Sequence, residues 1–364
     1  MLTDNGITLS LHGVNDTLIW GMSNAVRTER LAAKLNVTKP CIIWVNIAYA
    51  FDPQWMRYIS EHPGVVLTID GTPVLAHART ETELATLGNL DIPVEMTAME
   101  YRDGPQIHNH ELRKLDTPFV SLLDSRTVKT VERASYFGAY KGVTDILTKY
   151  LWPELALILT RIAAKIGLTP NMVTSIGAVG CVTATILFYY GHYWAGCAIG
   201  FIFMVLDTVD GKLARCTITS SWWGNIFDHG IDLVHPPFWY WAWAVGLSFW
   251  GQAYNSQTWW WVLGIVWGGY VLQRLVEGEF IRRYGIHIHV WQKFDSDFRL
   301  ITARRNPNMV LLVASLLFMR PDLGLIAVAI WTGLSCLIHI IRLFQAMALQ
   351  ARGKRIESWF LGAG

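Results

Sequence analysis

The sequence predicts a multidomain protein in which a six-helix transmembrane bundle is preceded by a soluble cytosolic α/β domain. Two observations predict this arrangement. Hydrophobic residues make up 52% of the 364 residues and charged residues only 16%, which is too apolar for an ordinary soluble protein. The apolar residues are also unevenly distributed, because long hydrophobic runs begin only after residue 170.

Residues 1–139 are expected to form the soluble domain. A polar helix is predicted over 24–35 and strands over 42–48 and 65–69, with Asp70 and Gly71 as a hairpin turn before a further strand at 73–76. Alternating strands and helices indicate a small α/β domain. The first residues have no basic leader and no continuous apolar core, so we expect no signal peptide and a cytosolic N-terminus.

Six membrane spans are expected in the domain 171–350, most of them close to the twenty or so residues that cross a bilayer core. Their ranges are 172–190, 193–212, 224–249, 258–282, 308–319 and 322–347. Residues 140–170 form a juxtamembrane segment, in which 150–167 is expected to lie as a helix in the membrane interface, with an additional span as the alternative. Residues 351–364 are expected to be a cytosolic tail.

The distribution of basic residues predicts the orientation. Lysines and arginines concentrate in 149–165, 212–215, 282–305 and 352–355, whereas the loops on the other side offer little besides Arg320. By the positive-inside rule, both termini face the cytosol. The five cysteines form no C-x-x-C pair, so neither a disulfide scaffold nor a cysteine zinc site is expected, and a net charge of +2 gives no reason to expect nucleic acid as a partner.

Four aspartates lie near the cytosolic edge of the second and third spans. The steps from Asp207 to Asp210 and from Asp228 to Asp232 each place two carboxylates on one helical face. If the two spans pack together, the carboxylates converge, and such a cluster in an apolar bundle requires a cation. Oxygen ligands favour Mg²⁺ or Mn²⁺, with two ions expected, and such ions suit phosphoryl chemistry. The neighbours that fit a nucleotide and its phosphates are Gly211, Lys212, Arg215 and Gly224.

The aspartates belong to a longer pattern, D-x-x-D-G-x-x-A-R-x8-G-x-x-x-D-x-x-x-D. Its fixed positions are Asp207, Asp210, Gly211, Ala214, Arg215, Gly224, Asp228 and Asp232. The pattern resembles the signature of the CDP-alcohol phosphatidyltransferase family. The resemblance covers roughly 140–350, where Leu168, Thr169, Pro170 and Asn171 are similar to the opening of the family's first span.

This resemblance implies a phospholipid-biosynthesis transferase that moves a substituted phosphate from a CDP-linked donor to a hydroxyl acceptor and releases CMP. It implies metal binding by Asp207, Asp210 and Asp228, with Asp232 as the general base that also touches a metal, and an active site facing the cytoplasm. The residues that it implies for the CDP moiety are Asp207, Gly211, Ala214, Arg215 and Gly224. It also implies a homodimer within the membrane.

The sequence Asp-His-Gly-Ile-Asp at 228–232 is similar to that of choline and ethanolamine phosphotransferases, and Leu233 stands where enzymes using CDP-diacylglycerol more often have a basic residue. A soluble CDP-alcohol donor with a lipid acceptor is therefore favoured. The alternative is transfer from CDP-diacylglycerol to a soluble alcohol or alcohol phosphate. Remoter alternatives are a non-catalytic lipid or nucleotide sensor, or a cation transporter whose intramembrane carboxylates line its pathway.

Several further residues are candidates for contacts with substrate or with the aspartates. His229 is expected to contact a carboxylate or the donor, with a packed histidine as the alternative. Glu277 either pairs with Arg274 or binds the acceptor. The remaining candidates are Lys212 and three residues of a basic loop, Arg299, Arg304 and Arg305. This loop is expected either to bind phosphate or to be an ordinary positive-inside loop.

The soluble domain bears a weak resemblance to a nucleotidyltransferase. The loop Gly21, Met22, Ser23, followed by Arg27 and Arg30, is similar to a triphosphate-binding loop but lacks a G-x-G core. We therefore expect a degenerate nucleotidyltransferase-like scaffold or regulatory domain. An active cytidylyltransferase and an unrelated interaction domain are the alternatives.

Overall fold

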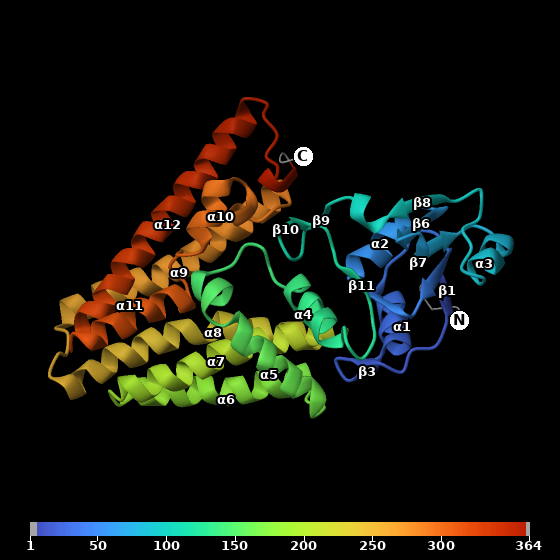
Figure 1. The fold of residues 1–364 in the computed structure, drawn as a ribbon. Helices are drawn as coiled ribbons and strands as arrows, with labels where there is room; N and C mark the ends of the chain where they lie inside the picture. The colour runs from blue at the N-terminus through green and yellow to red at the C-terminus, as the bar shows by residue number, and fades with distance from the viewer. Residues whose placement is uncertain (1–5, 362–364) are drawn as a thin grey trace. The chain divides into compact units, whose positions relative to one another are not determined.

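The computed structural model describes residues 6–361 and divides into two compact units (Figure 1). The α/β unit comprises Met1–Tyr140, Arg161–Leu168 and Lys212–Thr219, and the helical unit comprises Lys141–Thr160, Thr169–Gly211 and Ser220–Gly364. The predicted succession of an α/β domain and a helical domain is confirmed.

A five-stranded mixed sheet forms the centre of the α/β unit, in the order β1-β4-β7-β6-β8. Pairs β1/β4 and β6/β8 are parallel, whereas β7 runs antiparallel to both of its neighbours. The strands are β1 Ile7–His12, β4 Cys41–Asn46, β7 Thr72–Ala78, β6 Val65–Ile69 and β8 Thr97–Glu100. The predicted strands and the hairpin are confirmed, since Asp70 and Gly71 join β6 to β7 with φ angles of 47° and 77°.

Helices cover both faces of this sheet. Helices α1 (Asn24–Lys34) and α2 (Pro53–Glu61) pack on one face with Ile43 and Trp55, and α3 (Glu81–Leu87) packs on the other face with Trp44. Alternate residues of a strand point to opposite faces, which is why Ile43 and Trp44 enter different clusters. The remaining elements of the unit are β2 Leu18–Ile19, β3 Met22–Ser23, β5 Tyr49–Phe51, η1 Tyr101–Asp103, β9 Ile107–Asn109, β10 Lys114–Asp116, β11 Val120–Leu122 and α4 Val128–Gly138.

Long helices make up the helical unit, with α5 and α7 contributing residues to both units. These helices are α5 Pro153–Lys165, α6 Pro170–Tyr189, α7 Tyr193–Cys216, α8 Trp222–Gly246, α9 Ser256–Tyr284, α11 Arg305–Leu317 and α12 Pro321–Ala351. The shorter elements are η2 Leu147–Leu151, η3 Leu247–Trp250, η4 Ile288–Val290, α10 Lys293–Arg299 and η5 Trp359–Leu361.

Each of the six ranges predicted to span a membrane falls on one of these helices. Among the described residues, two helices, α6 and α12, are long and apolar enough by length and composition to cross a membrane. A membrane crossing by α7, α8, α9 and α11 stays a prediction. The first predicted span begins as expected, because Thr169 caps α6 by accepting from the Met172 N–H and Pro170 takes the first helical position.

Close packing holds the helices of this unit together. Helix α9 packs along α12, α12 along α11, and α6 along α8. A Cβ added to Gly269 of α9 would lie 2.7 Å from Cγ2 of Thr332 on α12. The absence of a side chain at this position therefore permits the close approach of α9 and α12, as small residues do in apolar helix pairs.

Two consecutive prolines, Pro236 and Pro237, lie inside α8. Proline has no N–H, so the two helical hydrogen bonds that these residues would donate are absent. Side chains of the neighbouring helix α9 donate hydrogen bonds to backbone carbonyls of α8 in this region. Tyr270 donates to the Leu233 carbonyl at 2.9 Å, and the indole of Trp267 donates to the Pro237 carbonyl at 3.0 Å.

Glu100 stabilises the β6–β7 hairpin. Its carboxylate accepts from the Thr68 hydroxyl at 2.8 Å and from the backbone N–H groups of Asp70 at 2.9 Å and Gly71 at 3.3 Å. These bonds, that from Thr68 first, lower the pKa of Glu100. Because folding lowers this pKa, the ionised carboxylate stabilises the folded protein at pH values above the ordinary glutamate pKa of about 4.3. This stabilisation is lost as the pH falls through the pKa that Glu100 has in the folded protein.

We predict that Glu100→Gln loosens this hairpin at neutral pH. Losing charge-assisted bonds at a partly exposed site costs about 1 kcal/mol, which corresponds to roughly fivefold faster amide exchange. Hydrogen-exchange mass spectrometry of peptides covering 65–78 measures the change, and peptides from α3 provide the internal control. Equal exchange in the wild type and the variant would contradict this role of Glu100.

Candidate active site

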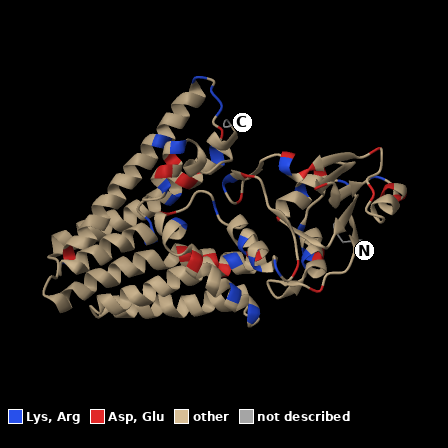
Figure 2. Cartoon of the chain, viewed as in Figure 1, with Lys and Arg blue, Asp and Glu red and all other residues tan. Residues whose placement is uncertain are grey.

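Three of the four aspartates converge in the helical unit. Asp207 is on α7, and Asp228 and Asp232 are on α8, with one carboxylate oxygen of each within 4.8 Å of the others. The hydroxyl of Ser221 caps α8 by accepting from the Gly224 N–H at 3.0 Å. The cap fixes the start of the helix that carries two of the carboxylates. Figure 2 shows that charged residues are sparse along this unit and mostly gather in two groups, one on α7 and α8 and one around α9, α10 and α12.

Asp210 makes a different set of contacts. Its carboxylate accepts from the hydroxyl of Thr174 on α6 at 2.5 Å and from the Gly211 N–H at 2.5 Å, and the residue is 3% exposed. The bond between Thr174 and Asp210 thus joins α6 and α7. The expected convergence is therefore seen for three carboxylates, with Asp210 held beside them on the same helix as Asp207.

Arg305, the first residue of α11, bridges the two aspartate helices. Its guanidinium donates from Nη1 to Asp232 at 2.6 Å and from Nη2 to Asp207 at 2.6 Å. The side chain is 12% exposed and also lies over the Phe203 ring. Burying several carboxylates together requires positive charge nearby, and Arg305 supplies it in this structure.

The residues beside Arg305 are anchored to different parts of the unit. The Ala303 N–H donates to the hydroxyl of Ser335 on α12 at 3.1 Å. Asn306 donates to Asp145 at 3.0 Å, and Asn308 donates to the hydroxyl of Tyr240 on α8 at 2.8 Å. The segment 303–308 therefore fixes the start of α11 against several elements.

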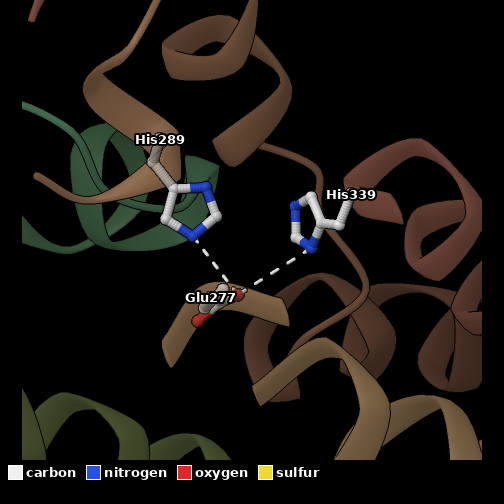
Figure 3. A group of neighbouring side chains, drawn as sticks. All are labelled: Glu277, His289 and His339. Atoms are coloured by element: carbon white, nitrogen blue, oxygen red, sulfur yellow. Dashed lines mark ion pairs between the residues drawn. The ribbon is translucent and has the colours of Figure 1, made fainter. Parts of the chain in front are cut away.

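Glu277 on α9 lies in a second cluster of titratable side chains (Figure 3). Arg304 donates to both of its carboxylate oxygens at 2.5 Å, and Arg274 Nη1 lies 3.6 Å away. Its carboxylate also lies 3.4 Å from His289 Nε2 and 3.9 Å from His339 Nδ1. The expected Arg274 pair is present, but Arg304 makes the shorter contacts. Arg299 lies half-buried at the end of α10.

The remaining candidates of the signature occupy varied surroundings. A Cβ on Gly224 would lie 2.8 Å from Oδ1 of Asn171, so the approach of α8 to α6 requires glycine here. His229 is largely exposed, with Nδ1 bonded to the Asn225 carbonyl at 2.9 Å and 3.7 Å from Asp228. Ala214 and Arg215 follow on α7 and are partly buried.

Lys212 is buried within the α/β unit. Its ammonium donates to the Ala139 carbonyl at 2.8 Å and lies 3.2 Å from the centre of the Tyr140 ring. These contacts give it a structural partner, and its expected contact with substrate phosphate stays a prediction.

The loop with a nucleotidyltransferase resemblance is tied into the α/β unit. Ser23 caps α1, and Arg27 is 1% exposed and donates to the Phe51 carbonyl at 2.8 Å. Burial lowers the pKa of Arg27 to about 10. Arg30 donates to the Thr217 carbonyl at 2.9 Å. The resemblance itself stays a prediction.

Sequence reasoning missed several residues of the site. Among them are Thr174, which bonds Asp210, and the anchoring residues Asn306 and Asn308. One sequence signal could have found the last two, because both asparagines stand at or just before the start of the predicted span 308–319, next to its apolar residues. Polar residues in such a place need partners inside the protein.

Comparison with known proteins identifies the helical region. Residues 167–339 match the family model of CDP-alcohol phosphatidyltransferase. These residues form a CDP-alcohol phosphatidyltransferase domain. Family members are integral membrane proteins that use divalent metals.

Curated relatives match parts of this domain. A CDP-alcohol phosphatidyltransferase class-I family protein of Schizosaccharomyces pombe is 36% identical over 131 residues, 32% of each chain. Human cholinephosphotransferase 1 is 36% identical over 150 residues, 38% of this chain and 33% of the relative. A phosphatidylinositol phosphate synthase of Streptomyces avermitilis is 32% identical over 93 residues, 24% of this chain and 38% of the relative. The matches span about a third of the length of these relatives.

A solved structure of Mycobacterium tuberculosis phosphatidylinositol phosphate synthase with CDP-DAG bound is similar at 16% identity and a TM-score of 0.42, covering 52% of this chain and 94% of that one.

The residues of the phosphatidyltransferase domain fit a divalent metal. The converging donors at Asp207, Asp228 and Asp232 are all carboxylate oxygens, which hard cations such as Mg²⁺ and Mn²⁺ prefer. Three closely spaced carboxylates carry more negative charge than the single guanidinium of Arg305 neutralises. The donor set and its charge thus both agree with a metal site.

We predict that Thr174→Val weakens metal binding about tenfold, because the hydroxyl that holds Asp210 is lost while the side-chain shape is kept. A tenfold higher Mn²⁺ concentration should then be needed before thermal stabilisation sets in. Thr183→Val is the matched control, since Thr183 lies on the same helix and bonds the Val179 carbonyl of its own helix. An unchanged Mn²⁺ dependence of Thr174→Val would show that the Thr174–Asp210 bond has no part in holding the metal.

Proposed function

We propose that this protein is an integral-membrane enzyme that transfers a substituted phosphate group from a CDP-linked donor to a hydroxyl acceptor and releases CMP. The convergence of Asp207, Asp228 and Asp232 on neighbouring helices is the observation that carries the proposal. The sequence supports this proposal through the match of residues 167–339 to the family model and through the complete eight-residue signature. Cytosolic termini and assembly as a homodimer are part of the same proposal.

In this proposal Asp207, Asp210 and Asp228 are metal ligands, with Asp232 as a further contact. Divalent cations bound there would neutralise charge on the donor's pyrophosphate and on the leaving CMP. The donor's nucleotide lies against Asp207, Gly211, Ala214, Arg215 and Gly224. The small residues Gly211 and Ala214 leave room for the nucleotide beside the backbone.

Asp232 is the proposed general base. It takes the proton of the acceptor hydroxyl while that oxygen bonds to the β-phosphorus and the bond to the CMP oxygen breaks. The Arg305 guanidinium, 2.6 Å from Asp232, favours the ionised carboxylate that a base requires. Divalent cations held by the aspartates would take over this neutralising charge, and the Arg305 guanidinium would then be free to bind phosphate oxygens.

A soluble CDP-alcohol donor and a lipid acceptor form the finer part of the proposal. The sequence Asp-His-Gly-Ile-Asp and the match to cholinephosphotransferase 1 support it. Transfer from CDP-diacylglycerol to a soluble alcohol or alcohol phosphate is the alternative.

We predict acceptor-dependent CMP release by the purified protein in lipid with Mg²⁺ or Mn²⁺. The assay compares soluble CDP-alcohols, offered with diacylglycerol, against CDP-diacylglycerol, offered with soluble alcohols and alcohol phosphates. CMP from the soluble donors supports the proposed direction, and CMP only from CDP-diacylglycerol reverses it. No CMP from any pair, in folded protein that binds Mn²⁺, would contradict the transferase.

We predict that Asp232→Asn abolishes transfer but leaves donor binding largely intact. Loss of a general base costs about 10²- to 10⁴-fold in rate. Single-turnover CMP release and equilibrium binding of the donor separate the two effects. Asp322→Asn is the control, since Asp322 pairs with Arg320 at the start of α12. Normal turnover by Asp232→Asn would overturn the assignment of the base.

His229 provides a further test, because its ring lies beside Asp228 and remains exposed. We predict that His229→Ala lowers kcat/KM for the donor by about tenfold, the effect of losing one contact of about 1.4 kcal/mol. Wild-type kinetics in His229→Ala would remove this residue from the mechanism.

A further inference from the structure

Two consecutive arginines at the start of α11 bind two separate acidic centres. Arg305 bonds Asp207 and Asp232, whereas Arg304 bonds both carboxylate oxygens of Glu277. One peptide group joins the two arginines. The position of Arg304 therefore restricts where the Arg305 guanidinium can lie.

The side chain of Arg304 has no local role in starting the helix. Arg304 is the N-cap residue of α11, but its side chain makes no capping hydrogen bond to the described part of that helix. Helices are more often begun by a short polar side chain that caps them locally. The place of this helix start is set instead by tertiary contacts, of which the Arg304–Glu277 ion pair is one.

The cluster around Glu277 is suited to holding an arginine. Glu277, His289 and His339 would be a familiar ligand set for a transition metal (Figure 3). However, Arg304 takes both carboxylate oxygens, and Arg274 lies 3.6 Å away. Two guanidinium groups already exceed the single carboxylate in charge. A further cation would add uncompensated positive charge, so the cluster favours anchoring of Arg304 over metal binding.

We infer that Glu277 is a positioning residue: through Arg304, it fixes the Arg305 guanidinium between Asp207 and Asp232. This inference rests on the proposed metal-binding role of those aspartates, because Arg305 is then the cation that a divalent ion displaces. An Arg305 side chain that is held less firmly competes less well with a divalent ion for the carboxylates of Asp207 and Asp232. Loss of the Glu277 anchor therefore favours binding of the divalent ion.

The test is a double-mutant cycle on the full chain in lipid, with Mn²⁺-dependent thermal stabilisation as the readout. Glu277→Gln and Arg305→Gln should each lower the Mn²⁺ concentration at which stabilisation sets in, by roughly three- to tenfold, the coupling typical of residues in one network. Glu277→Gln should add nothing in the Arg305→Gln background. If Glu277 acted only through its negative charge at long range, Glu277→Gln would instead raise the Mn²⁺ concentration needed for stabilisation, and it would do so in both backgrounds.

Two further variants complete the experiment. Glu277→Gln leaves the Arg304 charge buried and unpaired, so the double variant Glu277→Gln with Arg304→Gln removes the pair without that defect, and it should give the same shift. Glu279→Gln is the matched control. Glu279 lies two residues away on α9 and pairs with the neighbouring Arg282 and Arg283, so its loss should leave the Mn²⁺ dependence unchanged.

The outcomes separate this inference from the proposed function. Equal effects of Glu277→Gln in both backgrounds, or no effect in either, would overturn the positioning role. No stabilisation of the wild type by Mn²⁺ would contradict the metal site. In that case the unfolding temperatures of the same four proteins, measured in EDTA, still test the positioning role of Glu277. Non-additive losses support it, and additive losses overturn it.

Discussion

The bridge from Arg305 to Asp207 and Asp232 is the contact on which the rest of the helical unit depends. Carboxylates from two helices meet in a partly buried place, where the side chains of Asp207 and Asp232 are 17% and 43% exposed, and their repulsion would drive α7 and α8 apart. One guanidinium between them turns this repulsion into an attraction that joins three helices. The same contact keeps the carboxylates close together, as the proposed metal site requires.

The polar segment 303–308 extends this connection through the unit. Its successive residues bond Ser335 of α12, Glu277 of α9, the aspartates of α7 and α8, and Asp145. At other places the helices meet through small residues, as at Gly269 against Thr332. Fold and site are thus not separable here, because the contacts that arrange the helices are the contacts that arrange the carboxylates.

Much of this could be predicted from the sequence, and the limits have physical causes. Long apolar runs located the long helices, and short apolar runs with a hairpin turn located β4, β6 and β7. Helical spacing predicted that Asp228 and Asp232 share a face. Local spacing also suggested Arg274 as the partner of Glu277, whereas Arg304, distant in sequence, makes the shorter contacts. Pairings such as Arg305 with Asp207, and the edge position of β1, depend on tertiary packing that no local pattern encodes.

The two prolines of α8 have a mechanical consequence for the carboxylates. Pro236 and Pro237 remove two backbone hydrogen bonds from α8 immediately after Asp232, which makes the helix easier to bend there. The turn that carries Asp228 and Asp232 is thereby separated from the tightly packed remainder of the helix. If a smaller cation took the place of the guanidinium, as proposed, the spacing between α7 and α8 would change, and the two missing backbone bonds would lower the cost of bending α8 to accommodate it.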